Sequence, residues 1–388
     1  MYKRLLASTA LVAAGVVGVS AGAQAQTAPA TAPLSVTVGG YFEQSFGYSK
    51  NKDGIGAAAT TDSTDKMGKT ATTTLAKPNK WSNFYDSEIY FNVKGTLANG
   101  ITIGAIVQLE ANTERDMIDE SWMFIEGAFG RLDIGSTDEV AKKMAVTAPV
   151  AGKAASLSQS AAGDWVLRPS AVSRIDSVAV RASEDSQMVS YYTPRFEGLQ
   201  LGASYVPQRY EDTKVMADKN VTRTNVWAAG LNFTRSFSGF DVAASLGYEN
   251  APSLGSATAG TAGAVAEKSY AAGLRLGFAG FQVGGGYKKQ KYGAFSTDTG
   301  KAWEIGASYT FGPASVMIGY HKSDVEGLTA IAANDVSKLT LVGANYTLGP
   351  GVDLYANLFN LKYTDETSTA AADNNKGNGA IAGIRLTF

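Results

Sequence analysis

The sequence contains no cysteine and only one histidine, His321. The lack of cysteine excludes a disulfide framework, thiol catalysis and thiolate metal sites, and a single histidine argues against a histidine-based metal site. The 34 basic and 35 acidic residues leave a net charge of −1, without the basic surplus that nucleic-acid binding requires. We therefore expect no cofactor, no metal centre and no nucleic-acid partner.

Long apolar runs are also missing after the first thirty residues, and the mean hydropathy of −0.07 leaves no room for a bundle of membrane helices. Glycine and aromatic residues are plentiful instead, with 43 Gly, 18 Tyr and 16 Phe among 388 residues. The charged residues are only 18% of the chain. This composition is unusual for a soluble protein of such length.

The N-terminus has the pattern of an export signal. Lys3 and Arg4 precede an apolar stretch from Leu5 to Val19, and small residues follow as far as Ala25. This order of charged, apolar and small residues predicts a cleaved signal peptide over residues 1–25, with Ala23 as an alternative cleavage point, and a mature domain over residues 26–388. An N-terminal membrane anchor, the other interpretation, needs about 18 apolar residues or more.

Beyond Val36 the apolar residues recur with a period of two, which is typical of strands with one apolar face. Tyr270, Leu274 and Phe278 share one face, and Gly273 and Arg275 lie on the other. Aromatic residues stand at both ends of such apolar rows. The row spans about 26 Å along the strand, or roughly 20 Å vertically at a tilt of about 40°, which matches a bilayer's apolar band with two aromatic girdles.

The pattern predicts sixteen strands, and the connections between them alternate between tight turns and long polar loops. Their expected ranges are 36–48, 84–97, 100–112, 120–128, 131–137, 186–195, 198–208, 224–236, 239–250, 268–279, 281–292, 301–312, 314–325, 336–348, 351–363 and 378–388. An even strand number and turns of two kinds favour an all-β, transmembrane, antiparallel up-and-down β-barrel over a soluble β-protein. The barrel must close, because an open edge in lipid leaves backbone groups unpaired.

At this level the chain resembles the Gram-negative general porins of the 16-stranded, trimeric type. The residues that carry the resemblance are the opening from Val36 to Tyr41, the stretch from Phe129 to Gly135 and the end from Ala382 to Phe388. The resemblance implies a homotrimer in the outer membrane, surrounded by lipid, that passes ions and small hydrophilic solutes by passive diffusion. It also implies that Phe388 is an assembly signal for the barrel-assembly machinery.

The resemblance further implies that the third long loop, residues 138–185, folds into the barrel and narrows it, with acidic loop residues facing a basic wall. A sixteen-stranded barrel leaves an aqueous channel that its own wall cannot fill, which supports a constricting role for the loop. The loop carries six acids and six bases, and Ser136 stands where family members often carry arginine. The expected constriction residues are Asp138, Glu139, Lys142, Lys143, Asp164, Arg168 and Arg174.

Apolar loop residues such as Trp165 and Val172 are expected to pack on Trp122 and Phe124, which the alternation places inward beside Glu126. The alternation also turns eight acids and five bases toward the lumen, which predicts a weak preference for cations. Each of these charges alone also fits a solvated rim position. The main wall positions are Glu88, Lys94, Glu110, Arg131, Asp133, Arg275, Lys288, Glu304, Asp353 and Arg385.

Three alternatives stay open at this point. A hydrolase would have to use His321 as its base, with Ser315, Ser323 and Asp324 nearby in the sequence. An adhesin would use Thr/Ala/Gly-rich surface loops such as Gly56–Thr74. A substrate-selective outer-membrane channel would use the mixture of arginines and acids in the third long loop to recognise a particular solute.

Overall fold

The computed structural model describes residues 34–56, 76–111, 117–210, 215–220, 222–254, 266–291, 299–326, 333–366 and 370–388. The expected signal peptide and most of the Gly56–Thr74 tract lie outside these ranges. Among the described residues, no helix has the length and apolar character that a membrane-spanning helix needs.

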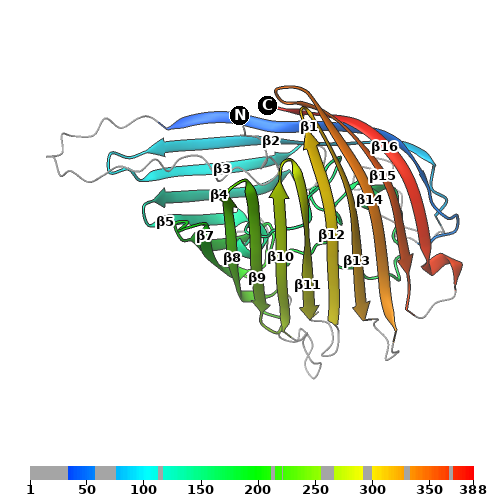
Figure 1. The fold of residues 1–388 in the computed structure, drawn as a ribbon. Coiled ribbons are helices and arrows are strands. Elements are labelled where there is room, and N and C mark those ends of the chain that lie inside the picture. The colour runs from blue at the N-terminus through cyan, green and yellow to red at the C-terminus, as the bar shows by residue number, and fades with distance from the viewer. Residues whose placement is uncertain are drawn as a thin grey trace.

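Sixteen antiparallel strands form one closed barrel, in which each strand pairs with its neighbours in the chain and β1 pairs with β16 (Figure 1). Every predicted strand boundary lies within about three residues of the observed one, so the predicted fold class is confirmed. The strands are β1 (Ser35–Lys50), β2 (Trp81–Thr96), β3 (Thr102–Glu110), β4 (Ile118–Gly127), β5 (Gly130–Thr137), β6 (Ser186–Tyr192), β7 (Leu199–Gln208), β8 (Thr224–Phe237), β9 (Phe240–Ala251), β10 (Glu267–Phe278), β11 (Phe281–Lys291), β12 (Thr299–Phe311), β13 (Ala314–Glu326), β14 (Asn334–Gly349), β15 (Val352–Thr364) and β16 (Asn375–Thr387). Three short helices complete the described elements, namely α1 (Val140–Lys143), α2 (Ala161–Trp165) and η1 (Ala371–Asp373).

The two chain ends close the barrel. Tyr41 of β1 lies opposite Thr387 of β16, and Gly40 and Phe388 exchange both of their backbone hydrogen bonds at 3.1 Å. The Phe388 side chain is 64% exposed and borders an outward-facing hollow that also contacts Phe42 and Ile89. The backbone of Phe388 therefore completes the pairing between β1 and β16, and its ring extends the apolar outer surface.

The tight turns have the backbone that two-residue hairpins require. Ser238 and Gly239 both have positive φ angles, of 48° and 93°, and so do Ala279 and Gly280, of 49° and 87°. Such turns match the right-handed twist of the flanking strands. The chain thereby reverses in two residues at one end of the barrel, and the long connections lie at the other end.

The outer surface carries an apolar band between two levels of paired aromatic rings. At the short-turn end, Phe240 stacks on Phe278 with ring centroids 4.4 Å apart. At the opposite end of the same two strands, Tyr248 lies 5.1 Å from Tyr270. Leu274 between them is 50% exposed, a degree of exposure that suits lipid and not water. The predicted aromatic girdles are therefore confirmed for this strand pair.

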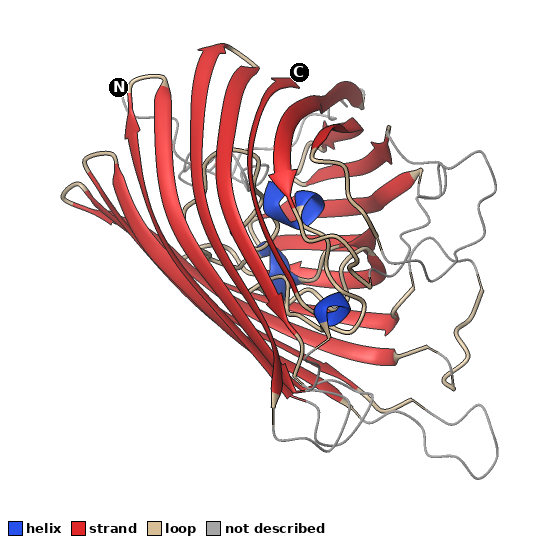
Figure 2. Cartoon of the chain, turned by 90° about the vertical axis from the view of Figure 1, so that its right-hand side faces the viewer, coloured by secondary structure: helices blue, strands red, loops and turns tan. Residues whose placement is uncertain are grey.

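Residues 138–185 lie within the barrel and not across its mouth (Figure 2). Helix α1 contacts β6 to β9, and α2 contacts β15 and β16 on the other side of the lumen. The loop thus covers a continuous arc of the inner wall from β6 round to β16. On β2 and β3, by contrast, inward-facing groups such as Asp86, Glu88 and Glu110 stay partly exposed, and these strands form the uncovered wall.

Small residues on the inner wall let the loop lie directly against the strands. Eight consecutive strands, β7 to β14, each turn one glycine toward it, and a Cβ at any of these glycines would contact loop atoms. These eight form the seat of the loop: Gly202, Gly230, Gly247, Gly273, Gly286, Gly306, Gly319 and Gly343.

This seat predicts a sharp difference between two Gly→Ala substitutions on neighbouring strands. A Cβ at Gly273 would overlap the carbonyl oxygen of Val146, whereas a Cβ at Gly247 would lie 3.4 Å from Ala141, an ordinary contact. Gly273→Ala should therefore destabilise the folded protein by about 1–3 kcal/mol, as overpacking does. Thermal unfolding in detergent, followed by circular dichroism, should show a lower midpoint for Gly273→Ala and a nearly unchanged one for Gly247→Ala. Equal midpoints for the two variants would contradict the proposed seat.

Candidate functional site: the lumen and its inner loop

The loop backbone is held by polar side chains that point inward from the strands. The N–H groups of Val146 and Ala148 donate to Ser245 Oγ at 2.7 Å and to Glu304 Oε1 at 2.9 Å. Farther along, the N–H of Lys153 donates to Asn357 Oδ1 at 2.7 Å. Because a buried backbone group without a partner is costly, these bonds let irregular backbone lie inside the barrel.

The apolar side chains of the loop pack on β13 to β16. Trp165, Val166 and Val172 are almost fully buried in one cluster with inward-facing residues of that wall, among them Leu341 and Phe359. A smaller cluster joins loop residues to β12 and β13. Loop burial therefore depends on inner-wall positions where large apolar residues replace the polar or small ones found on other strands.

The expectation that the apolar loop residues pack on Trp122 and Phe124 was wrong. Both rings do face inward, but they form a separate cluster with Ile106 on the opposite wall. Cations cover them: Lys143 lies 4.7 Å from the Trp122 ring centroid and Arg131 lies 4.2 Å from that of Phe124. Trp165, Val172 and Ile175 pack on β12 to β16 instead, and the Trp165 ring also lies 4.7 Å from that of Phe84 on β2.

The loop and the wall formed by β16, β1 and β2 enclose a lumenal pocket of about 380 Å³. Tyr41 and several serines of the loop supply polar groups to its lining. Its charged lining consists of Asp86, Lys153, Asp164, Arg174, Asp176, Arg181 and Arg385.

A single buried carboxylate pairs with two of these cations. Glu43 on β1 is 1% exposed, with Lys153 Nζ 3.0 Å from one carboxylate oxygen and an Arg385 guanidinium nitrogen 2.7 Å from the other. These contacts join the loop, β1 and β16 at the barrel seam. Because the two cations share one buried counter-charge, the three groups together keep a net charge of +1, less than the two cations would have alone.

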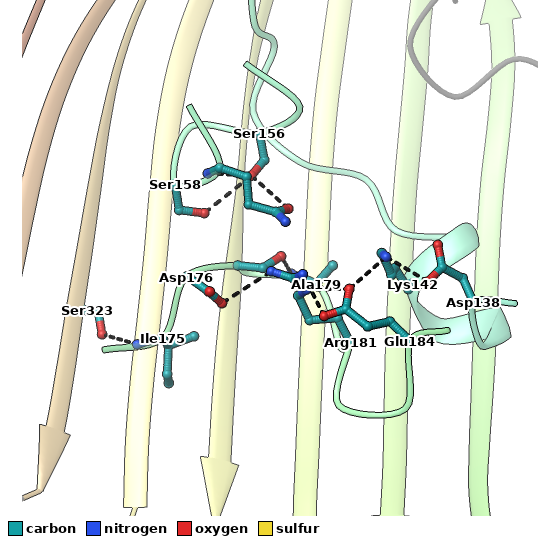
Figure 3. Close-up of polar contacts among 12 residues, drawn as sticks. Asp138, Lys142, Ser156, Ser158, Ile175, Asp176, Ala179, Arg181, Glu184 and Ser323 are labelled. Carbon is teal, nitrogen blue, oxygen red and sulfur yellow. Dashed lines mark hydrogen bonds and ion pairs between the residues drawn. The ribbon is translucent and has the colours of Figure 1, made fainter. Parts of the chain in front are cut away.

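The loop also neutralises charges within itself (Figure 3). Arg181 is bound to both oxygens of Glu184, at 2.8 and 2.6 Å, and lies 3.5 Å from Asp176. Lys142 donates to Asp138 at 2.6 Å and to Glu184 at 2.8 Å. Burial alone would lower the pKa of Lys142, but these two carboxylates raise it above the ordinary value, so the amine stays charged.

The uncovered wall is acidic. The carboxylates of Glu88, Glu110 and Asp119 on β2, β3 and the start of β4 approach within 4.8 Å of one another. The Tyr41 hydroxyl donates to Glu88 at 2.9 Å and to Asp86 at 3.1 Å. We call these four carboxylates the acidic strip.

The resemblance implied the reverse polarity, with acids on the loop and bases on the wall. Here the acidic strip lies on the wall, and loop cations such as Lys153 and Arg174 face the pocket. Ser136, in place of the expected arginine, donates its hydroxyl to the backbone oxygen of Asp185 at 2.5 Å and so secures the loop's end. The strand wall therefore lacks one of its usual cations.

The other predicted residues fall into two groups. Asp133, Lys288 and Glu304 are each at most 3% exposed, and all three lie beneath the loop. Glu139 is fully buried near Glu249, and burial raises its pKa well above the ordinary value. The remaining predicted residues keep some exposure, either near a barrel end or at the loop surface: Lys94, Arg131, Lys143, Arg168, Arg275 and Asp353.

The residues around His321 do not form a catalytic arrangement in the described part of the chain. His321 faces inward as predicted, is 3% exposed, and its Nε2 has no hydrogen-bond partner there. The Ser323 hydroxyl accepts the N–H of Ile175, and Asp324 pairs with Lys322 at 2.8 Å. Both groups are therefore occupied in structural contacts.

Sequence reasoning missed Asp86 and Asp119 as lumenal residues. Asp86 lies two residues before Glu88, so the same alternation assigns it to the inner face. Asp119 fell just outside the predicted fourth strand, 120–128, whereas the observed β4 begins at Ile118. No sequence signal paired Glu43 with Arg385, because that contact depends on the register across the seam.

Comparisons with known proteins agree with this geometry. A profile of the Gram-negative porin family matches residues 7–367. A search of curated protein sequences found no match.

Solved structures show the same fold. The chain is similar to an anion-selective porin from Comamonas acidovorans, with 16% sequence identity, a TM-score of 0.56, and coverage of 92% of this chain and 100% of that one. The outer membrane channel DcaP of Acinetobacter baumannii has 12% sequence identity and a TM-score of 0.59, with coverage of 92% of this chain and 97% of that one. OmpF of Salmonella typhi has 13% identity and a TM-score of 0.58, with coverage of 91% of this chain and 97% of that one.

Glu43 generates a prediction about ion selectivity. Glu43→Gln removes the counter-charge of Lys153 and Arg385, so the lumen should become more attractive to anions. In planar bilayers with a KCl gradient, the cation-to-anion permeability ratio should fall by about threefold, as expected for loss of partly exposed ion pairs. Asp353→Asn has the same charge change, and its smaller effect provides the control. A ratio that Glu43→Gln leaves unchanged would show that the two cations do not face the ion path.

Proposed function

This chain belongs to the Gram-negative porin family, and on that premise we propose that it is a weakly cation-selective molecular sieve. It forms an outer-membrane channel for the passive diffusion of solutes. The two finer properties, selectivity and sieving, are argued from the charges and the loop inside the barrel.

The acidic strip carries the proposal of cation preference. Glu88, Glu110 and Asp119 crowd one another on the wall that the loop leaves uncovered. Lys153 and Arg181 are each paired with carboxylates, which reduces their positive potential. Several carboxylates close together on the wall of a narrow lumen raise the local concentration of cations.

The loop supports the proposal of sieving. It crosses from α1 beside β6 to α2 beside β16, and its backbone is bonded to the wall along that path. Side chains of a sixteen-stranded wall alone would leave a wider aqueous channel. A loop secured at many points narrows the lumen to a defined size and so limits which solutes pass.

Assembly and export complete the proposal. The resemblance supports a homotrimer, and the pattern of residues 1–25 supports a cleaved signal peptide. The exposed ring of Phe388 at the seam suits recognition by the barrel-assembly machinery. We expect Phe388 to matter more for assembly than for finished stability, because sixteen strands of hydrogen bonds hold the closed barrel.

Catalysis is not part of the proposed function. The hydroxyl of Ser323 is bonded to the loop backbone, which leaves His321 without a nucleophile positioned by it among the described residues. The adhesin alternative concerned Gly56–Thr74, most of which lies outside the described residues. A substrate-selective channel is the remaining alternative, and it would have to recognise its solute through the charges of the lumenal pocket.

The acidic strip predicts the sign of the reversal potential. In a KCl gradient the wild-type channel should prefer K⁺, and Glu88→Gln should reduce that preference by about two- to threefold, since one partly exposed charge is lost. Glu326→Gln, the same change at the long-loop rim, should have a smaller effect. Clear anion selectivity of the wild type would refute the proposal and would mean that lysines and arginines dominate the narrowest point.

The loop predicts the conductance. Replacing residues 150–178 with a short Gly/Ser linker removes Lys153, Asp164 and Arg174 together with the loop's apolar contacts. Single-channel conductance and the size limit in liposome swelling should both increase, while the barrel stays assembled. Unchanged conductance of an assembled variant would show that the loop does not limit the ion path.

A further inference from the structure

The lumenal pocket contains one arginine that differs from its other cations. Lys153 and Arg385 pair with Glu43, and Arg181 pairs with Glu184. Arg174 has no carboxylate within 4.0 Å among the described residues, and its one hydrogen bond there goes to the Tyr363 hydroxyl at 3.0 Å. The rest of its guanidinium group therefore retains donors that a solute in the pocket can use.

Arg174 is also held in place before any solute arrives. The N–H groups on either side of it, of Ser173 and Ile175, donate to Asp335 Oδ2 at 2.6 Å and to Ser323 Oγ at 2.8 Å. The Ile175 side chain is 3% exposed and packs into β12 and β13. The guanidinium carbon lies 5.9 Å from the Tyr363 ring centroid. A donor group fixed in this way loses little conformational freedom on binding.

The same pocket has an acidic end. Asp164 on α2 is exposed to the lumen and has no hydrogen bond or ion pair among the described residues. A Cβ at the preceding Gly163 would lie 3.5 Å from Arg174 Nη2, so the helix approaches the guanidinium group closely. Asp86 lines the pocket from β2 and accepts one hydrogen bond, from Tyr41. The pocket thus presents an unpaired cation and two carboxylates in about 380 Å³.

We propose that this pocket is a weak binding site for small zwitterions, solutes that carry one carboxylate and one ammonium group as amino acids do. The solute carboxylate binds Arg174, whose planar donors match it in a paired geometry. The solute ammonium group binds Asp164 or Asp86. A pure cation leaves Arg174 unmatched and a pure anion leaves the carboxylates unmatched, so a zwitterion is the class that both ends favour.

The inference rests on the proposed function, because a solute reaches the pocket only through an open lumen. Weak binding at a constriction speeds passage at low solute concentration, provided that the solute also leaves readily. The site therefore predicts faster permeation of zwitterions than of neutral solutes of the same size. It also specifies the substrate class of the selective-channel alternative.

The test compares L-alanine with lactamide, two isomers that both have zero net charge at pH 7. Only alanine carries separated charges, so the overall charge of the channel does not favour either solute. In liposomes that contain the wild-type protein, alanine should cause swelling about threefold faster than lactamide or more, since hydrogen bonds to ionised groups are roughly twice as strong as neutral ones.

Single substitutions test the contribution of each end of the pocket to zwitterion passage. Arg174→Gln and Asp164→Asn should each bring the alanine-to-lactamide ratio toward one, because each variant removes one of the two charges that a zwitterion uses. Arg174→Lys keeps the charge but not the planar donors, and should give an intermediate ratio. Arg235→Gln removes an arginine that pairs with Glu197 at the short-turn end, and should keep the wild-type ratio.

A wild-type ratio of one or less, or a wild-type ratio retained in Arg174→Gln, would overturn the zwitterion site. In either case normal lactamide swelling and K⁺ preference would leave the proposed channel function intact. Failure of both solutes to cause swelling would instead refute passive diffusion, and with it this inference. Intact assembly of each variant is checked by the slower migration of the folded barrel in unheated gel samples.

Discussion

Pairing of backbone hydrogen bonds inside a lipid phase is the constraint on which the whole structure depends. No water is available there, so every strand needs two neighbours and the sheet must close on itself. The chain meets this demand by pairing β1 with β16, down to the reciprocal bonds between Gly40 and Phe388. Closure with sixteen strands then produces a lumen wider than wall side chains can fill.

The loop 138–185 narrows this wide lumen, and it divides the barrel wall into two kinds of surface. Beneath the loop, glycines such as Gly273 and polar groups such as Ser245 and Glu304 accommodate and bind its backbone. On the uncovered wall, Glu88 and its acidic neighbours face the lumen. Charges of similar appearance in the sequence therefore have different roles: Glu304 supports the loop, whereas Glu88 contributes to the field in the solute path.

Charge pairing across the lumen refines this division. Glu43 pairs with Lys153 and Arg385 at the barrel seam, and Glu184 pairs with Arg181 and Lys142 within the loop. Arg174 is left as a fixed donor without a carboxylate among the described residues, across the pocket from Asp86. The proposed selectivity therefore depends less on the total number of acids and bases than on which of them already have partners.

Period-two alternation determined the strand number, the boundaries and the face of nearly every side chain, because a membrane barrel requires one apolar and one polar face on each strand. The inward positions of Glu88, Trp122 and His321 followed from that rule alone. The packing of Trp165 on β13 to β16, the pairing of Glu43 with Arg385 and the reversed polarity of the lumen did not. Alternation is local and repeats along each strand, whereas the contacts of Trp165 and Glu43 join segments more than a hundred residues apart. The polarity of the lumen depends on which strands the loop covers, so only the closed barrel and the path of its inner loop decided these features.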